Sequence, residues 1–84
     1  MRFFFDIRDG QDLPDDIGTE LPDLDTAKQE AAQLAGRLLL DRPGEFWHTD
    51  KWQVRVRGDD GEVLLTLLVL AVPGRADRPP IALV

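Results

Sequence analysis

The sequence predicts an α+β two-layer sandwich, in which one helix packs on a mainly antiparallel sheet of three to four strands. Three observations support this prediction: a long amphipathic segment at 24–41, alternating apolar residues at 52–57, and the turn signal Asp60-Gly61 that follows them. The apolar stripe of a single helix must be buried, and the remaining segments can bury it only as a sheet. The predicted order along the chain is strand, short strand, helix, strand, strand.

The first strand is predicted at residues 3–8, because apolar side chains there alternate between the two faces. In this register Phe4 points away from the core, so it is an exposed aromatic residue unless another segment covers it. A turn is expected at 13–16, and a short strand at 17–20 is expected to fold back on the first. Gly18 in that short strand indicates a bulge or a position with positive φ.

The helix is predicted from Leu24 to about Asp41, because its apolar residues fall on one stripe at 100° per residue. The stripe consists of Leu24, Ala27, Ala31, Leu34, Ala35 and Leu38. Asp23 is the expected N-cap and Asp25 is the competing position, since a carboxylate can accept from the free amides of the first turn. Pro43 ends the helix because proline disfavours helical geometry at the preceding residue.

Residues 45–50 are predicted as a loop that carries Phe46 and Trp47. The next strand, at 52–57, has apolar side chains at even positions and leads into a hairpin. The last strand is predicted from Glu62 to about Val72. It is apolar on both faces, so we expect it at the centre of the sheet, between the first strand and the strand at 52–57.

The chain of 84 residues is predicted to be a single domain, residues 1–72, followed by a Pro-rich tail, residues 73–84. Its size leaves little room for an enclosed substrate cavity beside one core layer. It contains no cysteine, which excludes disulfides, thiolate metal sites and cysteine nucleophiles. The net charge of −6 disfavours nucleic acid as a partner, and no segment is apolar for long enough to span a membrane. A cytoplasmic protein is expected.

The chain combines several short motifs: Asp9-Gly10 after an aromatic strand, Asp15-x-x-Gly18-x-x-Leu21-Pro22-Asp23, an alanine-rich helix, and Trp52 ahead of Asp60-Gly61. Together these motifs resemble a small, uncharacterised bacterial domain-of-unknown-function family over residues 2–70. That resemblance implies the fold and a bacterial source, and it implies no activity or site. The step from a small sheet through Pro-Asp into the helix is also similar to antitoxins of the HicB type.

The stretch from Asp9 to Asp25 holds seven carboxylates and no basic residue. Asp9 and Glu20 stand at the first and twelfth positions of a calcium-loop register, but other ligand positions carry unsuitable residues and Pro14 replaces the required glycine. The stretch is interpreted as a solvated loop whose aspartates form turns and cap the helix. No metal site and no cofactor are predicted.

His48 is the only histidine, and the chain contains no serine. Without cysteine or a second histidine it cannot form a usual zinc site, and no threonine lies in an activating context. His48 is therefore interpreted as a surface loop residue, and no catalytic residue is predicted. Trp52 is assigned to the core, and Phe46 or Trp47 to the open end of the helix–sheet layer, rather than to a base-stacking platform.

The last strand leaves apolar side chains on the outer face of the predicted sheet. The predicted interaction surface consists of Phe4, Leu64, Leu68 and Leu70. Each leucine left in water forgoes about 1.5–3 kcal/mol of burial. Three covers are available: a second copy of the chain, a different protein, or the chain's own tail through Ile81, Leu83 and Val84.

The leading functional hypothesis is therefore a non-enzymatic protein-interaction module, a possible homodimer that associates through its outer sheet face. One alternative is an antitoxin-like acidic domain that binds a basic partner protein. The other alternative is an enzyme that depends on carboxylates and a metal ion. The acidic composition alone is better explained by solubility than by a basic partner.

Overall fold

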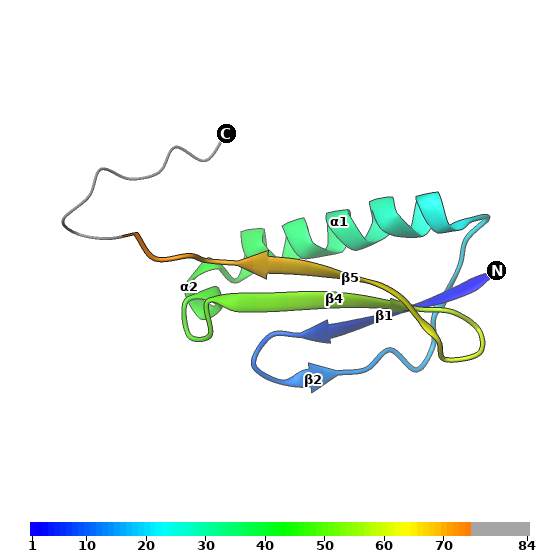
Figure 1. The fold of residues 1–84 in the computed structure, drawn as a ribbon, viewed down its shortest axis with the longest axis horizontal. Coiled ribbons are helices and arrows are strands. Elements are labelled where there is room, and N and C mark those ends of the chain that lie inside the picture. The colour runs from blue at the N-terminus through cyan, green and yellow to red at the C-terminus, as the bar shows by residue number, and fades with distance from the viewer. Residues whose placement is uncertain (75–84) are drawn as a thin grey trace.

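Helix α1 (Leu24–Asp41) lies across one face of an antiparallel sheet in the computed structural model of the chain, which describes residues 1–74 (Figure 1). The strands are β1 (Arg2–Arg8), β2 (Asp12–Leu13), β3 (Thr19–Glu20), β4 (Lys51–Arg57) and β5 (Val63–Leu70). The predicted α+β sandwich is confirmed. The sheet has five strands rather than three to four, because two short pairings on β1 each count as a strand.

The central strand of the sheet is β4, which pairs with β1 on one side and with β5 on the other. The prediction that the last strand lies between the other two long strands is therefore wrong. β5 forms an edge of the described sheet, and its outer-face side chains are exposed. Apolar residues on both faces usually indicate a strand that is covered on both sides, and here they occur on a strand that is not.

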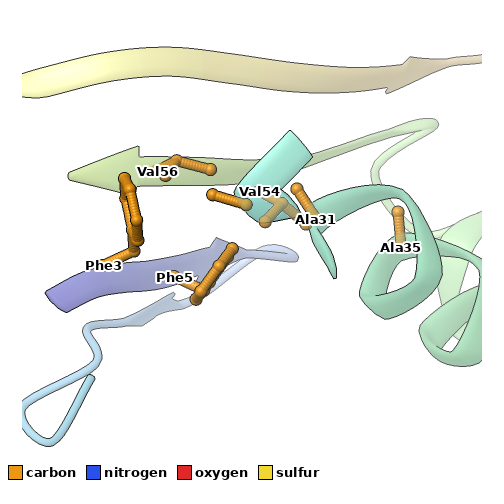
Figure 2. Packing of buried hydrophobic residues seen from close by; sticks show 7 residues of the cluster. Phe3, Phe5, Ala31, Ala35, Val54 and Val56 are labelled. Atoms are coloured by element: carbon orange, nitrogen blue, oxygen red, sulfur yellow. The ribbon is translucent and has the colours of Figure 1, made fainter. Parts of the chain in front are cut away.

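The core lies between α1 and the inner face of β1 and β4 (Figure 2). Phe3 and Phe5 from β1 pack against Val54 and Val56 from β4, and all four side chains are buried. Small alanine side chains on α1 cover this layer and allow the helix to approach the sheet closely. They are Ala27, Ala31 and Ala35.

Both ends of α1 follow from the sequence. The Asp23 side chain accepts hydrogen bonds from the Thr26 backbone N–H at 2.8 Å and from its hydroxyl at 2.7 Å, which confirms the predicted N-cap. The helix ends before Pro43, as predicted. A second short helix, α2 (Pro43–Phe46), then begins, so the predicted loop at 45–50 is wrong in its first two residues. Proline at the first position of α2 needs no N–H partner, which suits it to start a helix.

The segment between β1 and α1 contains one strand that the sequence interpretation missed. β2 pairs with the end of β1, in the register Ile7 to Leu13, where a turn was expected from position 13. The short strand expected at 17–20 is present only as β3. Gly18 has φ of +76°, which confirms the predicted positive φ.

The hairpin between β4 and β5 is closed by the Gly58 N–H, which donates to the Glu62 carbonyl at 2.9 Å. Gly61 carries a positive φ of +82°, as a turn with a glycine bulge requires. Of the predicted tail, residues 75–84 lie outside the described residues. The expected cover by Ile81, Leu83 and Val84 therefore falls outside the described part of the chain.

Candidate interaction surface

The outer face of the sheet, opposite α1, divides into a polar side and an apolar side. β4 contributes a central row of polar side chains, which are Gln53, Arg55 and Arg57. Across from this row, β5 presents Thr66, Leu68 and Leu70, and Leu64 follows at an irregularity in the β4–β5 pairing, where it has no direct partner on β4; all four residues are exposed. We call the three exposed leucines, Leu64, Leu68 and Leu70, the leucine stripe.

Phe4 belongs to the polar side of the outer face and not to the leucine stripe. It lies on β1, opposite Arg57 of β4, whose guanidinium carbon is 5.0 Å from the centre of the Phe4 ring. Gly18 lies close to Phe4 as well, since a Cβ added to Gly18 would be 2.9 Å from Phe4 Cε1. The structure thus brings three of the four predicted surface residues together, and it places Phe4 two strands away under an arginine.

A hydrogen-bond network around Arg57 satisfies the charged groups on the polar side of this face. Arg57 Nε donates to Asp6 Oδ2 at 2.6 Å, and its Nη2 donates to the Asp15 carbonyl at 2.9 Å. The Asp15 backbone N–H donates in turn to Asp6 Oδ1 at 2.9 Å. The hydrogen bond from Arg57 holds the pKa of Asp6 below its ordinary value, against the opposing effect of partial burial.

The side chain of Asp15 binds three backbone N–H groups. Oδ1 accepts from Ile17 and Gly18, both at 3.0 Å, and Oδ2 accepts from Phe5 on β1 at 3.1 Å. Desolvation raises the pKa of Asp15, but these N–H groups together outweigh it, so the pKa lies below its ordinary value. Asp15 therefore fixes the loop against the edge of β1.

Other carboxylates of the acidic stretch are also bound to basic groups from elsewhere in the chain. Asp9 accepts from Arg42 Nη2 at 2.6 Å, and Asp12 accepts from Arg8 Nε at 2.6 Å. Across residues 1–74, no three acidic or histidine side chains gather in a way that would hold a metal ion. The stretch from Asp9 to Asp25 thus uses much of its charge to join the loop to β1, α1 and α2.

The aromatic residues near α2 divide between the core and the surface. Trp52 is 3% exposed and packs edge-on against buried Phe46, with ring centres 5.4 Å apart. The Trp52 indole N–H has no hydrogen-bond partner among the described residues. Trp47 is 65% exposed, so Phe46 rather than Trp47 closes the end of the layer. His48 is exposed beside them.

Two open grooves beside the acidic loop have volumes of about 380 and 350 Å³, and neither encloses a ligand. A third groove, on the polar side of the sheet, has a volume of about 220 Å³ and is lined by side chains of β1, β2 and β4, including Asp6, Arg8 and Arg55. Pockets that bind small molecules usually measure roughly 300–1,000 Å³ and enclose most of the ligand. The charged groups of the third groove lie beside the structural pairs described above, so this groove offers no separate set of reactive side chains.

The edge of β5 exposes backbone groups as well as leucine side chains. The Ala71 N–H donates to the Asp50 carbonyl at 2.9 Å, so the backbone groups of Ala71 point toward β4. In an antiparallel pair this direction alternates from one residue to the next. The backbone N–H and C=O groups of Leu70, Leu68 and Thr66 therefore point away from β4. Within residues 1–74, no other strand pairs with this edge.

The inner face of β5 is also incompletely covered. On β4, the inner-facing residues Trp52, Val54 and Val56 are at most 3% exposed. Their direct neighbours on β5 are only partly buried, although they pack against the same core; these neighbours are Val69, Leu67 and Leu65. The strand thus lacks cover on both faces at its free edge.

Comparison with protein families matches residues 2–71 to a domain of unknown function, DUF6894. The chain belongs to the DUF6894 family. This family description carries no activity, so it confirms the expected membership of an uncharacterised family and assigns no site. No curated protein and no solved structure gives a significant match to this DUF6894 chain. Within its described residues, no helix combines the length and the apolar character that crossing a bilayer requires.

Sequence reasoning about this DUF6894 domain identified the leucine stripe but missed the free backbone edge beside it. The signal was present in the charges of β4. Arg55 and Arg57 alternate with valines, and a strand with such a polar outer row favours acidic partners on a neighbour. β1 supplies Asp6, whereas β5 supplies no carboxylate, which favours pairing of β4 with β1 as well as with β5 and so places β5 at the edge.

Proposed function

We propose that this DUF6894 domain is a non-enzymatic protein-interaction module that binds through the leucine stripe of β5. The observation that supports it is the edge position of a strand whose eight residues include no charge, proline or glycine. Natural edge strands usually carry such residues, or are covered, because an open apolar edge pairs with other chains. A cytoplasmic location is part of this proposal and is compatible with the acidic, cysteine-free composition.

The contrast between the two sides of the outer face supports a binding role. On the polar side, Arg57 donates hydrogen bonds to Asp6 and Asp15, and its guanidinium lies over the Phe4 ring. On the other side, Leu68 and Leu70 are 49% and 54% exposed. Covering such side chains contributes roughly 25 cal/mol for each Å² of apolar surface removed from water. A partner on β5 therefore gains hydrophobic burial without breaking an existing ion pair.

The experiment compares the wild-type chain with Leu68→Asp and with a matched control, Leu40→Asp. Leu40 is 79% exposed on α1, so the control adds the same charge to another exposed leucine. Light scattering and affinity capture should show a larger species or a bound protein for the wild type and Leu40→Asp, and a free monomer for Leu68→Asp. Circular dichroism should show all three chains folded. Identical behaviour of all three in both assays would contradict the proposal.

A further inference from the structure

We infer that two copies of this chain pair through their β5 edges, antiparallel and with the twofold axis at Thr66, to form one continuous sheet. This inference rests on the proposed function and names the partner as a second copy. The paired segment is short, and it is specified by three independent features: its sequence symmetry, its free backbone groups and the placement of charge around it.

The sequence of β5 is symmetric about Thr66. Residues 63–69 read Val-Leu-Leu-Thr-Leu-Leu-Val, which is the same in both directions. In an antiparallel pair centred on this threonine, Leu64 lies opposite Leu68 of the second copy, and Leu65 lies opposite its Leu67. Within residues 63–69, every cross-strand pair then joins two identical residue types, and the axis carries a threonine pair, which can hydrogen-bond across strands. A twofold interface requires this kind of self-complementary surface.

The free backbone groups suit this register. Thr66 and Leu68 point their N–H and C=O groups away from β4, as derived above from the Ala71–Asp50 hydrogen bond. Thr66 can therefore exchange two backbone hydrogen bonds with its own copy across the axis. A dimer formed only by stacking the outer faces would leave these groups without a protein partner.

Pairing at the edge would also complete burial on both faces of β5. Leu65 and Leu67 face the core side but remain partly exposed. In the dimer, Leu65 of each copy would contact Leu67 of the other. On the outer face, Leu64 and Leu68 would form two equivalent cross-strand contacts. One strand added at the edge thus covers apolar surface that no partner docked on a single face would cover.

The charges around β5 permit this dimer despite the net charge of −6. The acidic hairpin, with Asp59, Asp60 and Glu62, lies at one end of the strand. In the proposed register Glu62 lies opposite Leu70 of the second copy, so the two hairpins are at opposite ends of the pair. Eight residues at 3.3–3.4 Å each separate the two Glu62 positions by roughly 27 Å. This exceeds the screening length of about 8 Å at physiological ionic strength.

Leu70 also has a basic neighbour. It pairs with Lys51 on β4, so Glu62 of the second copy would approach the strand next to a lysine. The chain's own tail is the competing occupant, and it contains Pro79-Pro80, which cannot donate backbone hydrogen bonds to a strand. The β5 strand of a second copy contains no proline, so it can donate backbone hydrogen bonds along its whole length.

The test uses single cysteines, because the natural chain has none. Thr66→Cys places two thiols across the axis, where a mild oxidant such as copper phenanthroline should join them into a covalent dimer. Leu70→Cys is the matched control on the same exposed face, with thiols roughly 27 Å apart in this register. Leu68→Cys reports on register, since its thiols would be roughly 13 Å apart, beyond disulfide reach. We expect Thr66→Cys to cross-link at least about tenfold faster than either control.

Each result decides the inference. Rapid cross-linking of Thr66→Cys alone supports it, and faster cross-linking of Leu68→Cys overturns the proposed register. If all three cysteine variants cross-link only at the background rate, while the wild type is a dimer that Leu68→Asp dissociates, edge pairing is overturned. The proposed function is then left intact. A wild-type monomer with background cross-linking overturns the dimer and favours the tail as the cover.

A second measurement needs no cysteine variant. The amide hydrogens of Thr66 and Leu68 should exchange at least about tenfold more slowly in wild-type chain at high concentration than at low concentration, because pairing covers them. The amide of Leu67, which points toward β4, should change less. Concentration-independent exchange at Thr66 and Leu68 would overturn the inference.

Discussion

Arg57 on β4 donates to both carboxylate oxygens of Asp6 on β1, from Nε to Oδ2 at 2.6 Å and from Nη2 to Oδ1 at 3.0 Å. The fork geometry of the guanidinium makes this contact directional. The pair joins the centre of the sheet to β1, and Asp15 holds the loop against the same strand by accepting from the Phe5 N–H. The chain thus covers its β1 side with its own loop, and the described residues contain no equivalent cover for β5.

Arg57→Lys should destabilise the domain by about 1–3 kcal/mol, since a lysine keeps the charge but loses the paired hydrogen bonds and the stacking on Phe4. The free energy of unfolding can be measured by urea denaturation. Arg37→Lys is the matched control, because the one ion pair of Arg37 within residues 1–74 is a long, exposed contact to Glu30 at 3.5 Å on α1. The control should change stability by less than about 0.5 kcal/mol. Equal effects of the two substitutions would contradict the role assigned to Arg57.

The domain should lose stability as the pH falls below about 4, the ordinary pKa of an aspartate. Hydrogen bonding to Arg57 lowers the folded-state pKa of Asp6, and backbone N–H groups outweigh desolvation to lower that of Asp15. Below about pH 4 the unfolded chain therefore binds more protons than the folded chain, and stability decreases with decreasing pH. Above that pH the contribution of both groups is fully present.

Thermal unfolding between pH 7 and pH 2 measures this dependence. Asp15→Asn should lower the melting temperature at pH 7 and should flatten the decline in acid, because the titrating group is absent. A variant with the same decline as the wild type would show that Asp15 does not contribute to the acid sensitivity.

Local sequence rules predicted the elements better than their arrangement. The helix boundaries follow from Asp23 and Pro43, whose effects act within one turn, and the alternation of β1 follows from period two. The order of the strands depends on which side chains match across the sheet. Asp6 and Arg57 are 51 positions apart, so this pairing can be recognised only by comparing the charges of two distant strands.

The same distinction applies to the candidate surface. The leucines of β5 were identifiable because too many apolar residues occur in one strand for a single buried face. Phe4 was grouped with them, since parity along a strand fixes the face and not the position across the sheet. β2 was missed because a two-residue strand leaves no periodic pattern, and its pairing near Ile7 depends on a loop held by Asp15.

Two glycines of this chain should respond to alanine in opposite directions. Gly18 has φ of +76°, and an added Cβ would lie 2.9 Å from Arg2 Cγ and 3.0 Å from the Phe3 carbonyl oxygen. Gly18→Ala should destabilise the domain by about 1–3 kcal/mol. Alanine is strained at this positive φ, and the Phe3 carbonyl belongs to the backbone and cannot move away freely.

Gly36 lies within α1 and is exposed, and an added Cβ would meet no atom within 4 Å. Gly36→Ala should stabilise the domain by about 0.5–1 kcal/mol, since alanine loses less backbone entropy in a helix than glycine does. Urea denaturation of the two variants measures both changes against the wild type. The pair is informative because the substitution is the same in each case. If Gly18→Ala were neutral, the loop would not hold its backbone against β1 as described, and the Asp15 contacts that depend on that position would lose their support.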